Sequence, residues 1–465
     1  MHIKFVYTLV YIILPSILIA HCAQVATGTA VKVVTVNQED RSFGEFVDDT
    51  IIKTSIKNIY FDQNEKLFFN IDVEVSQGRV LLTGTIENID LKISKIIAKD
   101  DTKESNEKIL IKEEEFRSNF ILNLDKELVQ LNKELRFLIK QNQYAEFSDR
   151  HGGIKGIYLN GYHFNNKNKM DLIESVFKNT NVNTLVIDIK TDNGHVLFET
   201  NNPLAIEMNN VRSKYNKASL EEFKNDKNLY LIGRVVVFQD PLFAKKYPEE
   251  AVFDTAKNTI YSQDGQYFID PSSKKAQNYI IDISKEACEL GFDEIQFDYI
   301  RYPDSSYQYM KFKDESTFEN RIKNINSFLS LAKPEINSLG CLLSADVFGF
   351  ILTNKFDGGI GQNLETMIEN LDFISPMVYP SHYNSGSFGF SNPNRNPYGV
   401  ISAALQDALD RDVQPYKLRP FLQGFWHTDF EVRENIRAAE DKDLGWLIWN
   451  VSSSYNLEYF SKIDS

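Results

Sequence analysis

Two aspartates interrupt apolar runs in the C-terminal half of the chain. Asp298 ends the run that begins at Glu294, and Asp346 lies inside the run over residues 341–348. An ionised carboxylate within a core is costly unless it is paired. Two carboxyl groups that share one cleft can cleave a glycosidic bond, because one protonates the leaving oxygen while the other attacks the sugar or activates water. Asp298 as nucleophile or base and Asp346 as acid are therefore the predicted catalytic residues.

Each aspartate also has a structural interpretation. Asp298 could be the ion-pair partner of Arg301 or Arg234, and Asp346 could cap the loop that follows it. A nearby cation lowers a carboxyl pKa, whereas burial and a like charge raise it. The segment "LLSADVFGF" around Asp346 contains no cation. We therefore predict that Asp298 stays ionised and that Asp346 has the raised pKa and donates the proton.

Other polar and aromatic side chains follow the same apolar runs and are expected to face the same cleft. The predicted substrate-binding residues are Asp188, Arg234, Arg301, Tyr379, His382, Trp426 and Trp449. Aromatic rings can stack on the apolar faces of sugars, although each ring alone could equally pack between loops. For Asp188, the sequence "KTDNG" that includes the next residues also fits a turn. The sequence shows neither metal-ligand spacing nor a Gly-x-Ser-x-Gly element, so no metal and no other cofactor is expected.

Eight apolar runs, separated by segments of helical pattern, must position these residues. They cover residues 154–160, 184–190, 229–238, 294–301, 341–348, 373–380, 419–426 and 445–451. Short continuous apolar runs are typical of strands that are buried on both faces. The pattern predicts an α/β fold, a (β/α)₈ TIM barrel over residues 153–465. In such barrels the catalytic groups lie at the C-terminal ends of the strands.

The first residues have the pattern of a targeting segment. Lys4 precedes an apolar run from Phe5 to Ala20, so residues 1–22 are predicted to be a signal peptide and the protein to be exported. Cys22 follows "LIAH", which resembles a lipobox with His21 in place of the usual small residue. Lipidation of Cys22, as in a lipoprotein, and simple cleavage near Ala20 both remain open. The expected location is periplasmic or membrane-anchored.

Residues 44–112 have the pattern of a small α+β domain. A helix from Thr50 to Tyr60 is followed by alternating residues that predict strands over 69–76 and 79–86, and then by another helix. With the segments "VDDTIIKTSIKN" and "VEVSQGRVLLTGTIEN", this order resembles the BON domain of bacterial envelope lipoproteins. The resemblance implies contact with phospholipid or a membrane surface, and not catalysis.

Residues 113–150 are predicted to form a connecting helix and linker. Leucines recur there at helical spacing, namely Leu124, Leu128, Leu131, Leu135 and Leu138. We expect this stripe to pack on a neighbouring domain. The polar segment "YAEFSDRHGG" at residues 144–153 predicts an exposed boundary, beyond which the barrel should fold alone.

The net charge bears on whether the protein binds nucleic acid, and the cysteines bear on whether it contains a disulfide. The 51 Lys and Arg against 65 Asp and Glu give a net charge of −14. Because binding to phosphate backbones needs clustered cations, nucleic acid is not an expected partner.

Cys288 lies in a helical pattern and Cys341 in a strand pattern, so two buried free thiols are expected rather than a disulfide.

Five segments carry a family resemblance over the C-terminal part. In order they are "VIDIKTDNG", "GFDEIQFDYIRYP", "SADVFG", "ISPMVYPSHY" and "GWLIWN". They resemble a bacterial barrel family classed as a domain of unknown function and "putative glycosyl hydrolase". The resemblance implies a glycoside hydrolase that acts on an envelope or extracellular polysaccharide. The alternative is a non-catalytic glycan-binding barrel, or a scaffold, held near the membrane by the BON-like domain.

A more distant similarity is to chitinase-like barrels. Asp293, Asp298 and the "MVY" segment beginning at Met377 match parts of that pattern. Gln296 and Ile300 replace two of its acidic residues, including the acid itself. The substrate-assisted chemistry of chitinases is therefore not expected here.

Overall fold

The computed structural model describes residues 71–76, 79–84 and 129–461. These belong to two compact units, Met1–Leu110 and Ile111–Ser465, which are described separately. The predicted signal peptide, Cys22 and the helices of the predicted BON-like domain lie outside the described residues. So do Leu124 and Leu128 of the leucine stripe.

The described residues of the first unit form a hairpin. Strand β1 (Ile71–Ser76) pairs antiparallel with β2 (Arg79–Gly84), with Val73 opposite Leu82. This pairing confirms the two strands predicted on either side of residues 77–78. A hairpin occurs in many kinds of domain, so the BON-like assignment stays a prediction.

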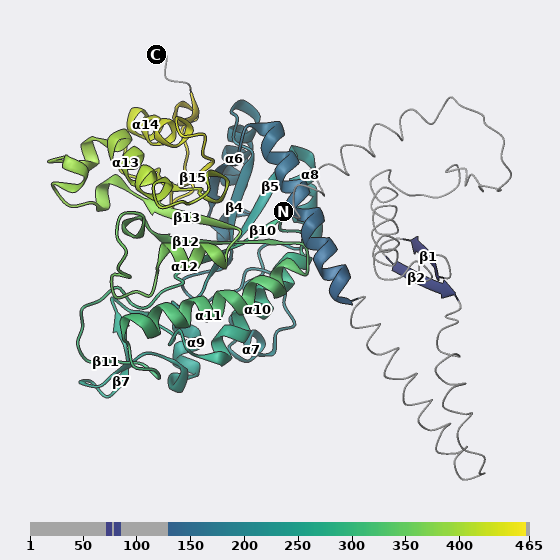
Figure 1. The fold of residues 1–465 in the computed structure, drawn as a ribbon, viewed down its shortest axis with the longest axis horizontal. Helices are drawn as coiled ribbons and strands as arrows, with labels where there is room; N and C mark the ends of the chain where they lie inside the picture. The colour runs from purple at the N-terminus through teal and green to yellow at the C-terminus, as the bar shows by residue number, and fades with distance from the viewer. Residues whose placement is uncertain (1–70, 77–78, 85–128, 462–465) are drawn as a thin grey trace, which may run out of the picture. The chain divides into compact units, whose positions relative to one another are not determined.

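Eight parallel strands close into a barrel in the second unit (Figure 1). They are β3 (Lys155–Leu159), β4 (Thr184–Lys190), β5 (Tyr230–Val236), β10 (Glu294–Asp298), β12 (Leu342–Phe348), β13 (Phe373–Val378), β14 (Phe421–Gln423) and β15 (Trp446–Trp449). Strand β15 pairs with β3 and so completes the ring. Each predicted apolar run contains one of these strands, which confirms the α/β barrel.

Helices connect successive strands and lie on the outside of the barrel (Figure 1). They are α6 (Lys167–Asn179), α7 (Pro203–Glu207), α8 (Lys217–Lys227), α9 (Pro241–Lys246), α10 (Lys274–Glu289), α11 (Phe318–Asn337), α12 (Leu364–Glu369), α13 (Pro397–Leu409) and α14 (Asp429–Glu440). Capping boxes at Asn216 and Thr428 fix the starts of α8 and α14. No helix in the described part of the chain is long and apolar enough to cross a membrane.

The loops after β5 and β10 pair with each other beside the barrel. They contain β6 (Phe253–Asp254), β7 (Thr259–Ile260), β8 (Ser262–Gln263), β9 (Gln266–Tyr267) and β11 (Met310–Lys311). Strand β11 pairs with β6, and Val252, Tyr261 and Phe268 form a small separate core. These contacts hold the two loops in fixed positions relative to each other.

A helix over residues 129–151 precedes the barrel and covers the N-terminal ends of its strands. The Tyr144 ring centroid lies 5.5 Å from that of Tyr230 and 4.5 Å from that of Phe373, the first residues of β5 and β13. Lys140 forms an ion pair with Asp293, which directly precedes β10. The helix therefore belongs to the barrel unit as its floor.

These contacts agree only in part with the predicted packing of the helix. Tyr144 and Phe147 contact the barrel core, whereas in the described part of the leucine stripe Leu131 and Leu135 are half-buried and Leu138 is 53% exposed. The segment from residue 144 continues the helix through residue 151, and much of it is exposed, as its composition predicts. Folding of the barrel without this segment stays a prediction. This segment is polar because only one face of the helix meets the barrel.

Cys288 and Cys341 form a disulfide, which corrects the prediction of two free thiols. Cys288 lies in the last turn of α10, and Cys341 directly precedes β12. Their Cα atoms are 5.9 Å apart, a separation that suits a disulfide. The two cysteines are 53 residues apart in the sequence and meet only because α10 ends at the floor of the barrel, beside β10 and β12.

Candidate active site

A cavity of about 880 Å³ opens at the C-terminal ends of the strands. Its size is typical of ligand-binding sites. Of the residues predicted from the sequence, its lining includes Arg234, Asp298, Arg301, Asp346, Tyr379, His382 and Trp449. Asp188 and Trp426 do not line it. The structure thus gathers most of the predicted residues, from five strands and their loops, around one space.

Strand alternation explains why the two aspartates face the inside of the barrel. Ile295 and Phe297 of β10 belong to the core between barrel and helices, so the alternate residue Asp298 faces inward. The register pairs Phe297 with Ala345 of β12, which places Asp298 and Asp346 at equivalent positions one residue further on. Adjacent strands lie about 5 Å apart, so the two aspartates have neighbouring backbones.

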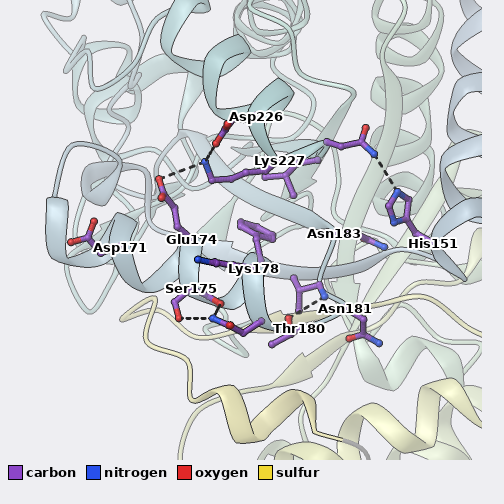
Figure 2. Close-up of a pocket in the computed structure, with 15 residues that line it drawn as sticks. His151, Asp171, Glu174, Ser175, Lys178, Thr180, Asn181, Asn183, Asp226 and Lys227 are labelled. Atoms are coloured by element: carbon purple, nitrogen blue, oxygen red, sulfur yellow. Dashed lines mark hydrogen bonds and ion pairs between the residues drawn. The ribbon is translucent and has the colours of Figure 1, made fainter.

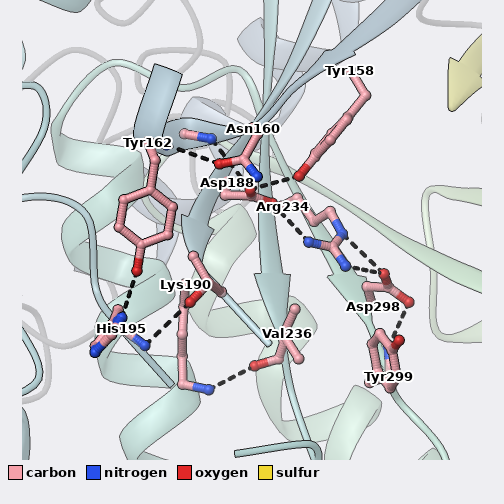
Figure 3. A network of polar contacts seen from close by, with 12 residues as sticks. Tyr158, Asn160, Tyr162, Asp188, Lys190, His195, Arg234, Val236, Asp298 and Tyr299 are labelled. Atoms are coloured by element: carbon pink, nitrogen blue, oxygen red, sulfur yellow. Dashed lines mark hydrogen bonds and ion pairs between the residues drawn. The ribbon is translucent and has the colours of Figure 1, made fainter. Parts of the chain in front are cut away.

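Arg234 of β5 binds two carboxylates at once (Figure 3). Its Nε and Nη2 donate to Oδ2 of Asp298 at 2.9 and 2.5 Å, and its Nη1 donates to Oδ1 of Asp188 at 2.7 Å. All three side chains are buried. A buried ion pair is tolerated only when good geometry and further hydrogen bonds satisfy the charges. Asp298 is therefore paired with Arg234, in agreement with one of its structural interpretations.

Asp188 lies behind Arg234 instead of on the cavity wall. Its Oδ2 accepts hydrogen bonds from the Tyr158 hydroxyl at 2.7 Å and from the Gly161 amide at 3.2 Å (Figure 3). Burial raises the pKa of Asp188, and Arg234 and the Tyr158 hydroxyl oppose that rise. Asp188 is thus in a position to orient Arg234, and through it Asp298, without reaching the cavity.

Asp346 has a contrasting environment. It is only 2% exposed, and its Oδ1 has no hydrogen-bond partner among the residues that the structure describes. Burial raises the pKa of Asp346 well above its usual range, the charge of Asp298 raises it further, and Arg234 and Arg419 oppose the rise. A raised pKa at Asp346 agrees with the prediction. A protonated carboxyl beside an ion-paired one is the arrangement of an acid and a base.

Arg301 reaches the cavity but does not bind Asp298. It forms an ion pair with Asp304 at 3.2 Å and donates to the carbonyl of Tyr302 at 3.1 Å. Its guanidinium lies over the rings of Tyr299 and Phe348, 5.0 and 4.8 Å from their centroids. These contacts fix Arg301 as a second cation on the cavity wall.

Aromatic rings make up another part of the wall. Trp449 stacks at a tilt on Tyr158, with centroids 4.1 Å apart, and the Arg234 guanidinium lies 5.0 Å from the Trp449 ring. Tyr379 contacts His382 edge to face at 5.3 Å. Burial lowers the pKa of His382, which keeps its imidazole neutral near pH 7. The cavity therefore combines a carboxyl pair with flat apolar surfaces.

Comparison with known proteins agrees with this geometry. Residues 156–455 match the family described as "Putative glycosyl hydrolase domain", a range that extends from β3 past β15. The chain belongs to this family. A comparison with curated proteins gives no match.

Several solved structures are similar to this glycosyl hydrolase family member. A hypothetical protein from Ruminiclostridium thermocellum is 36% identical, with 41% of this chain and 97% of that chain covered and a TM-score of 0.37. The PgaB (BpsB) glycoside hydrolase domain from Bordetella bronchiseptica is 11% identical, with coverages of 64% and 94% and a TM-score of 0.49. The spore cortex-lytic enzyme SleL from Bacillus cereus is 13% identical, with coverages of 66% and 72% and a TM-score of 0.41.

Some cavity residues of this family member were not predicted from the sequence. They include Tyr299, Asp304, Phe348, Phe350, Asn354, Met377, Asn384, Phe388 and Phe421. Most of them lie in loops, where the direction of a side chain depends on the backbone. Phe348, Met377 and Phe421 lie on strands, and strand alternation with Asp346, Tyr379 and Gln423 could have identified them.

A second cavity, of about 800 Å³, lies at the opposite end of the barrel between α6, α8 and the residues before β4 and β5 (Figure 2). Three of its charged side chains pair with one another: Lys227 contacts Asp226 at 2.8 Å and Glu174 at 3.6 Å. TIM-barrel enzymes carry out catalysis at the C-terminal end. We therefore assign the chemistry to the first cavity. Within the described ranges, no three His, Cys, Asp or Glu side chains are grouped so as to hold a metal ion.

Proposed function

We propose that the barrel hydrolyses glycosidic bonds of an envelope or extracellular polysaccharide, with Asp298 and Asp346 as the catalytic pair. One observation carries the proposal: two aspartates on adjacent strands line the same cavity in opposite electrostatic environments. Asp298 is paired with Arg234, whereas burial raises the pKa of Asp346. Glycoside hydrolysis needs one protonated and one ionised carboxyl in this relation.

In this proposal Asp346 donates its proton to the glycosidic oxygen as the bond to the leaving sugar breaks. Asp298 has about four acceptor positions, of which Arg234 occupies two on Oδ2 and the Tyr299 amide one on Oδ1. The remaining position on Oδ1 is the one that attacks the sugar or activates water. Carboxyl groups on adjacent strands favour the short separation of retaining enzymes, in which the nucleophile forms a covalent glycosyl intermediate. Water, deprotonated by the Asp346 carboxylate, then cleaves this intermediate, which frees Asp298 and returns the proton to Asp346.

The other residues of the site have supporting roles. Arg234 holds the Asp298 carboxylate in place, and Asp188 with Tyr158 orients Arg234. Trp449 provides a flat floor for a sugar ring, and Arg301, Tyr379 and His382 contact its polar groups. This chemistry requires only side chains, so the proposal includes no metal and no other cofactor.

We place the activity outside the cytoplasm. The disulfide between Cys288 and Cys341 supports this location, because such bonds persist in oxidising compartments. Export through residues 1–22, attachment at Cys22 and contact of residues 44–112 with a membrane surface or phospholipid belong to the same proposal and rest on sequence alone.

The test is a screen of the full-length protein for release of reducing ends from envelope and capsular glycans. Asp298→Asn and Asp346→Asn should each lower the rate strongly on any glycan that the wild-type protein cleaves. Asp304→Asn is the matched control, since this carboxylate lines the same cavity but is 39% exposed and lies in the loop beyond β10. Activity that survives in Asp298→Asn, or that is lost equally in Asp304→Asn, would remove the proposed pair.

A glycan-binding barrel without catalysis is the second candidate. The ion pair with Arg234 favours it, because that pair satisfies much of the hydrogen-bonding capacity of Asp298. This candidate predicts that glycans bind the wild-type protein and both asparagine variants equally well, with no release of reducing ends from any glycan in the screen.

A further inference from the structure

Trp426 lies beside the cavity, and its large apolar side chain is unusually exposed to solvent. It is 82% exposed and lies in the turn between β14 and α14. Its backbone has a φ of 56°, a left-handed conformation that is unfavourable for an aromatic residue. Hydrophobic burial cannot account for this conformation, because most of the ring remains in solvent.

The turn that carries Trp426 is held firmly on its first side. The Gly424 amide donates to the carbonyl of Trp449 at 2.9 Å, and the Asn450 side chain donates to the carbonyl of Gly424 at 2.7 Å. A Cβ at Gly424 would lie 2.4 Å from a side-chain atom of Ile448, so only glycine allows this approach. The turn is therefore fixed beside Trp449, which lines the cavity.

The other side of the turn is equally well held. His427 is buried, with its Nε2 2.9 Å from Oδ1 of Asn394 and its Nδ1 3.1 Å from the side-chain nitrogen of Asn435. The buried Gln423 donates to the carbonyl of Phe425 at 2.9 Å. These bonds keep the backbone that carries the exposed indole at one position, as in a preformed binding surface.

Aromatic contacts connect this ring to the cavity. Trp426 packs edge to face on Phe425, with centroids 5.1 Å apart, and Phe425 packs in the same way on Tyr379 at 5.3 Å. Tyr379 lines the cavity. A flat apolar surface thus lies just outside the site and continues its aromatic wall.

We propose that Trp426 is an outer subsite that stacks on a sugar ring of a polysaccharide chain whose neighbouring sugars occupy the cavity. This inference rests on the proposed glycan-directed function and deepens it. It makes the substrate a long chain and not a single sugar or disaccharide. The planar face of an indole suits the apolar face of a pyranose, whose hydroxyl groups would remain in solvent at such an exposed position.

The test measures binding and turnover separately. Binding is measured by retardation in native gels that contain glycol chitin, hydroxyethyl cellulose or alginate, which represent amino-sugar, neutral and acidic polymers. We expect at least one polymer to retard the full-length protein, Trp426→Ala to weaken that retention at least fivefold, and Trp426→Phe to keep most of it. Tyr416→Ala is the control, because Tyr416 is also exposed but precedes β14 at the other end of the barrel.

Turnover gives the second readout. Trp426→Ala should lower kcat/KM at least fivefold on the polymer and less than twofold on an aryl glycoside of a single sugar. The inference is overturned if none of the three polymers retards the wild-type protein, or if Trp426→Ala binds them as tightly as the wild type. It is also overturned if this variant changes only the elution volume in size-exclusion chromatography, which would assign the ring to a protein contact. Loss of retention in Trp426→Ala together with no hydrolysis by the wild type would uphold the subsite and reject the catalytic proposal.

Discussion

Arg234 gives Asp298 and Asp346 different environments, although these two aspartates lie on adjacent strands. It donates two hydrogen bonds to Asp298 and one to Asp188, whereas Oδ1 of Asp346 has no partner among the described residues. The sequence predicted this asymmetry from the lack of cations around Asp346. It also indicated Arg301 as a neighbour of Asp298, but Arg301 pairs with Asp304. The left-handed backbone at Tyr299, with φ of 52°, redirects the chain directly after Asp298, and no sequence pattern indicates that turn.

The assignment of acid and base predicts a dependence on the leaving group. Asp346→Asn should lower kcat/KM on a natural polysaccharide by about 10²- to 10⁴-fold, the usual contribution of a general acid. It should affect aryl glycosides with good leaving groups far less, since these need little protonation. Asp298→Asn should lower the rate on both kinds of substrate. Kinetics on the two substrate types would show reversed roles if Asp298→Asn instead gave the selective loss.

The same residues predict the dependence of rate on pH. Asp346 acts while protonated, and burial raises its pKa well above the ordinary value. Activity should therefore fall as pH rises through that raised pKa, which gives a bell-shaped profile with an optimum on the acidic side of neutrality. With an activated aryl glycoside, Asp346→Asn should lose the decline on the basic side. A profile of kcat/KM with the same basic decline in this variant would assign the decline to another group.

Burial of Asp346 also predicts a change in stability. A raised pKa means that the folded state holds this proton more tightly than the unfolded chain, whose aspartates have pKa values of about 4. Stability from this proton is fully present below about pH 4, and it declines by about 1.4 kcal/mol for each pH unit until the pH passes the raised pKa. Asp346→Asn should therefore exceed the wild type in free energy of unfolding at pH 7 but not at pH 4.

Chemical denaturation at the two pH values would measure this difference. Asp304→Asn is the control, because the Asp304 side chain is 39% exposed and paired with Arg301. Equal pH dependence of the wild type and Asp346→Asn would mean that folding does not raise the pKa of Asp346, which would contradict its role as the acid.

At the scale of elements, the helix over residues 129–151 illustrates what a repeat pattern can and cannot predict. Helical spacing of leucines correctly indicated a helix, since that spacing is a local property. It did not indicate which face meets the barrel. Tyr144 and Phe147 pack on the N-terminal ends of the strands, and Lys140 pairs with Asp293. The partners of these side chains lie at or just before the first residues of strands that are far away in the sequence, and only closure of the barrel brings them together.

The packing of this helix predicts unequal effects of two substitutions within it. Tyr144→Ala removes a ring that packs on Tyr230 and Phe373 and should lower the free energy of unfolding by about 3 kcal/mol. Leu138→Ala, at an exposed position of the same helix, should change it by less than about 0.5 kcal/mol. Thermal unfolding followed by near-ultraviolet circular dichroism compares the two. A larger loss for Leu138→Ala would support the leucine stripe as the packing face.

At the scale of the whole molecule, the eight strands were predictable because each is a continuous apolar run that a parallel sheet buries on both faces. Their order placed Asp298, Asp346 and Arg234 around one end without any knowledge of contacts. The pairing of Cys288 with Cys341 was not predictable in this way. It depends on where α10 ends relative to β12, which is a consequence of the closed barrel and not of either segment.

The disulfide predicts sensitivity of the fold to reduction. It closes a loop between residues 53 apart, and a cross-link of that span stabilises a fold by up to about 4 kcal/mol relative to the open chain. A reductant should lower the Tm of the wild-type protein, and Cys288→Ser with Cys341→Ser should reproduce that lower Tm and make it insensitive to reductant. Calorimetry with and without reductant measures both effects. An unchanged Tm of the wild type after complete reduction, verified by thiol titration, would contradict this prediction.

The helix that forms the floor covers only one end of the barrel. Residues 129–151 contact the starts of the strands, whereas the cavity opens where the strands end. The floor helix and the entrance to the cavity therefore lie at opposite ends of the barrel, so a polymer can approach the entrance without meeting this helix.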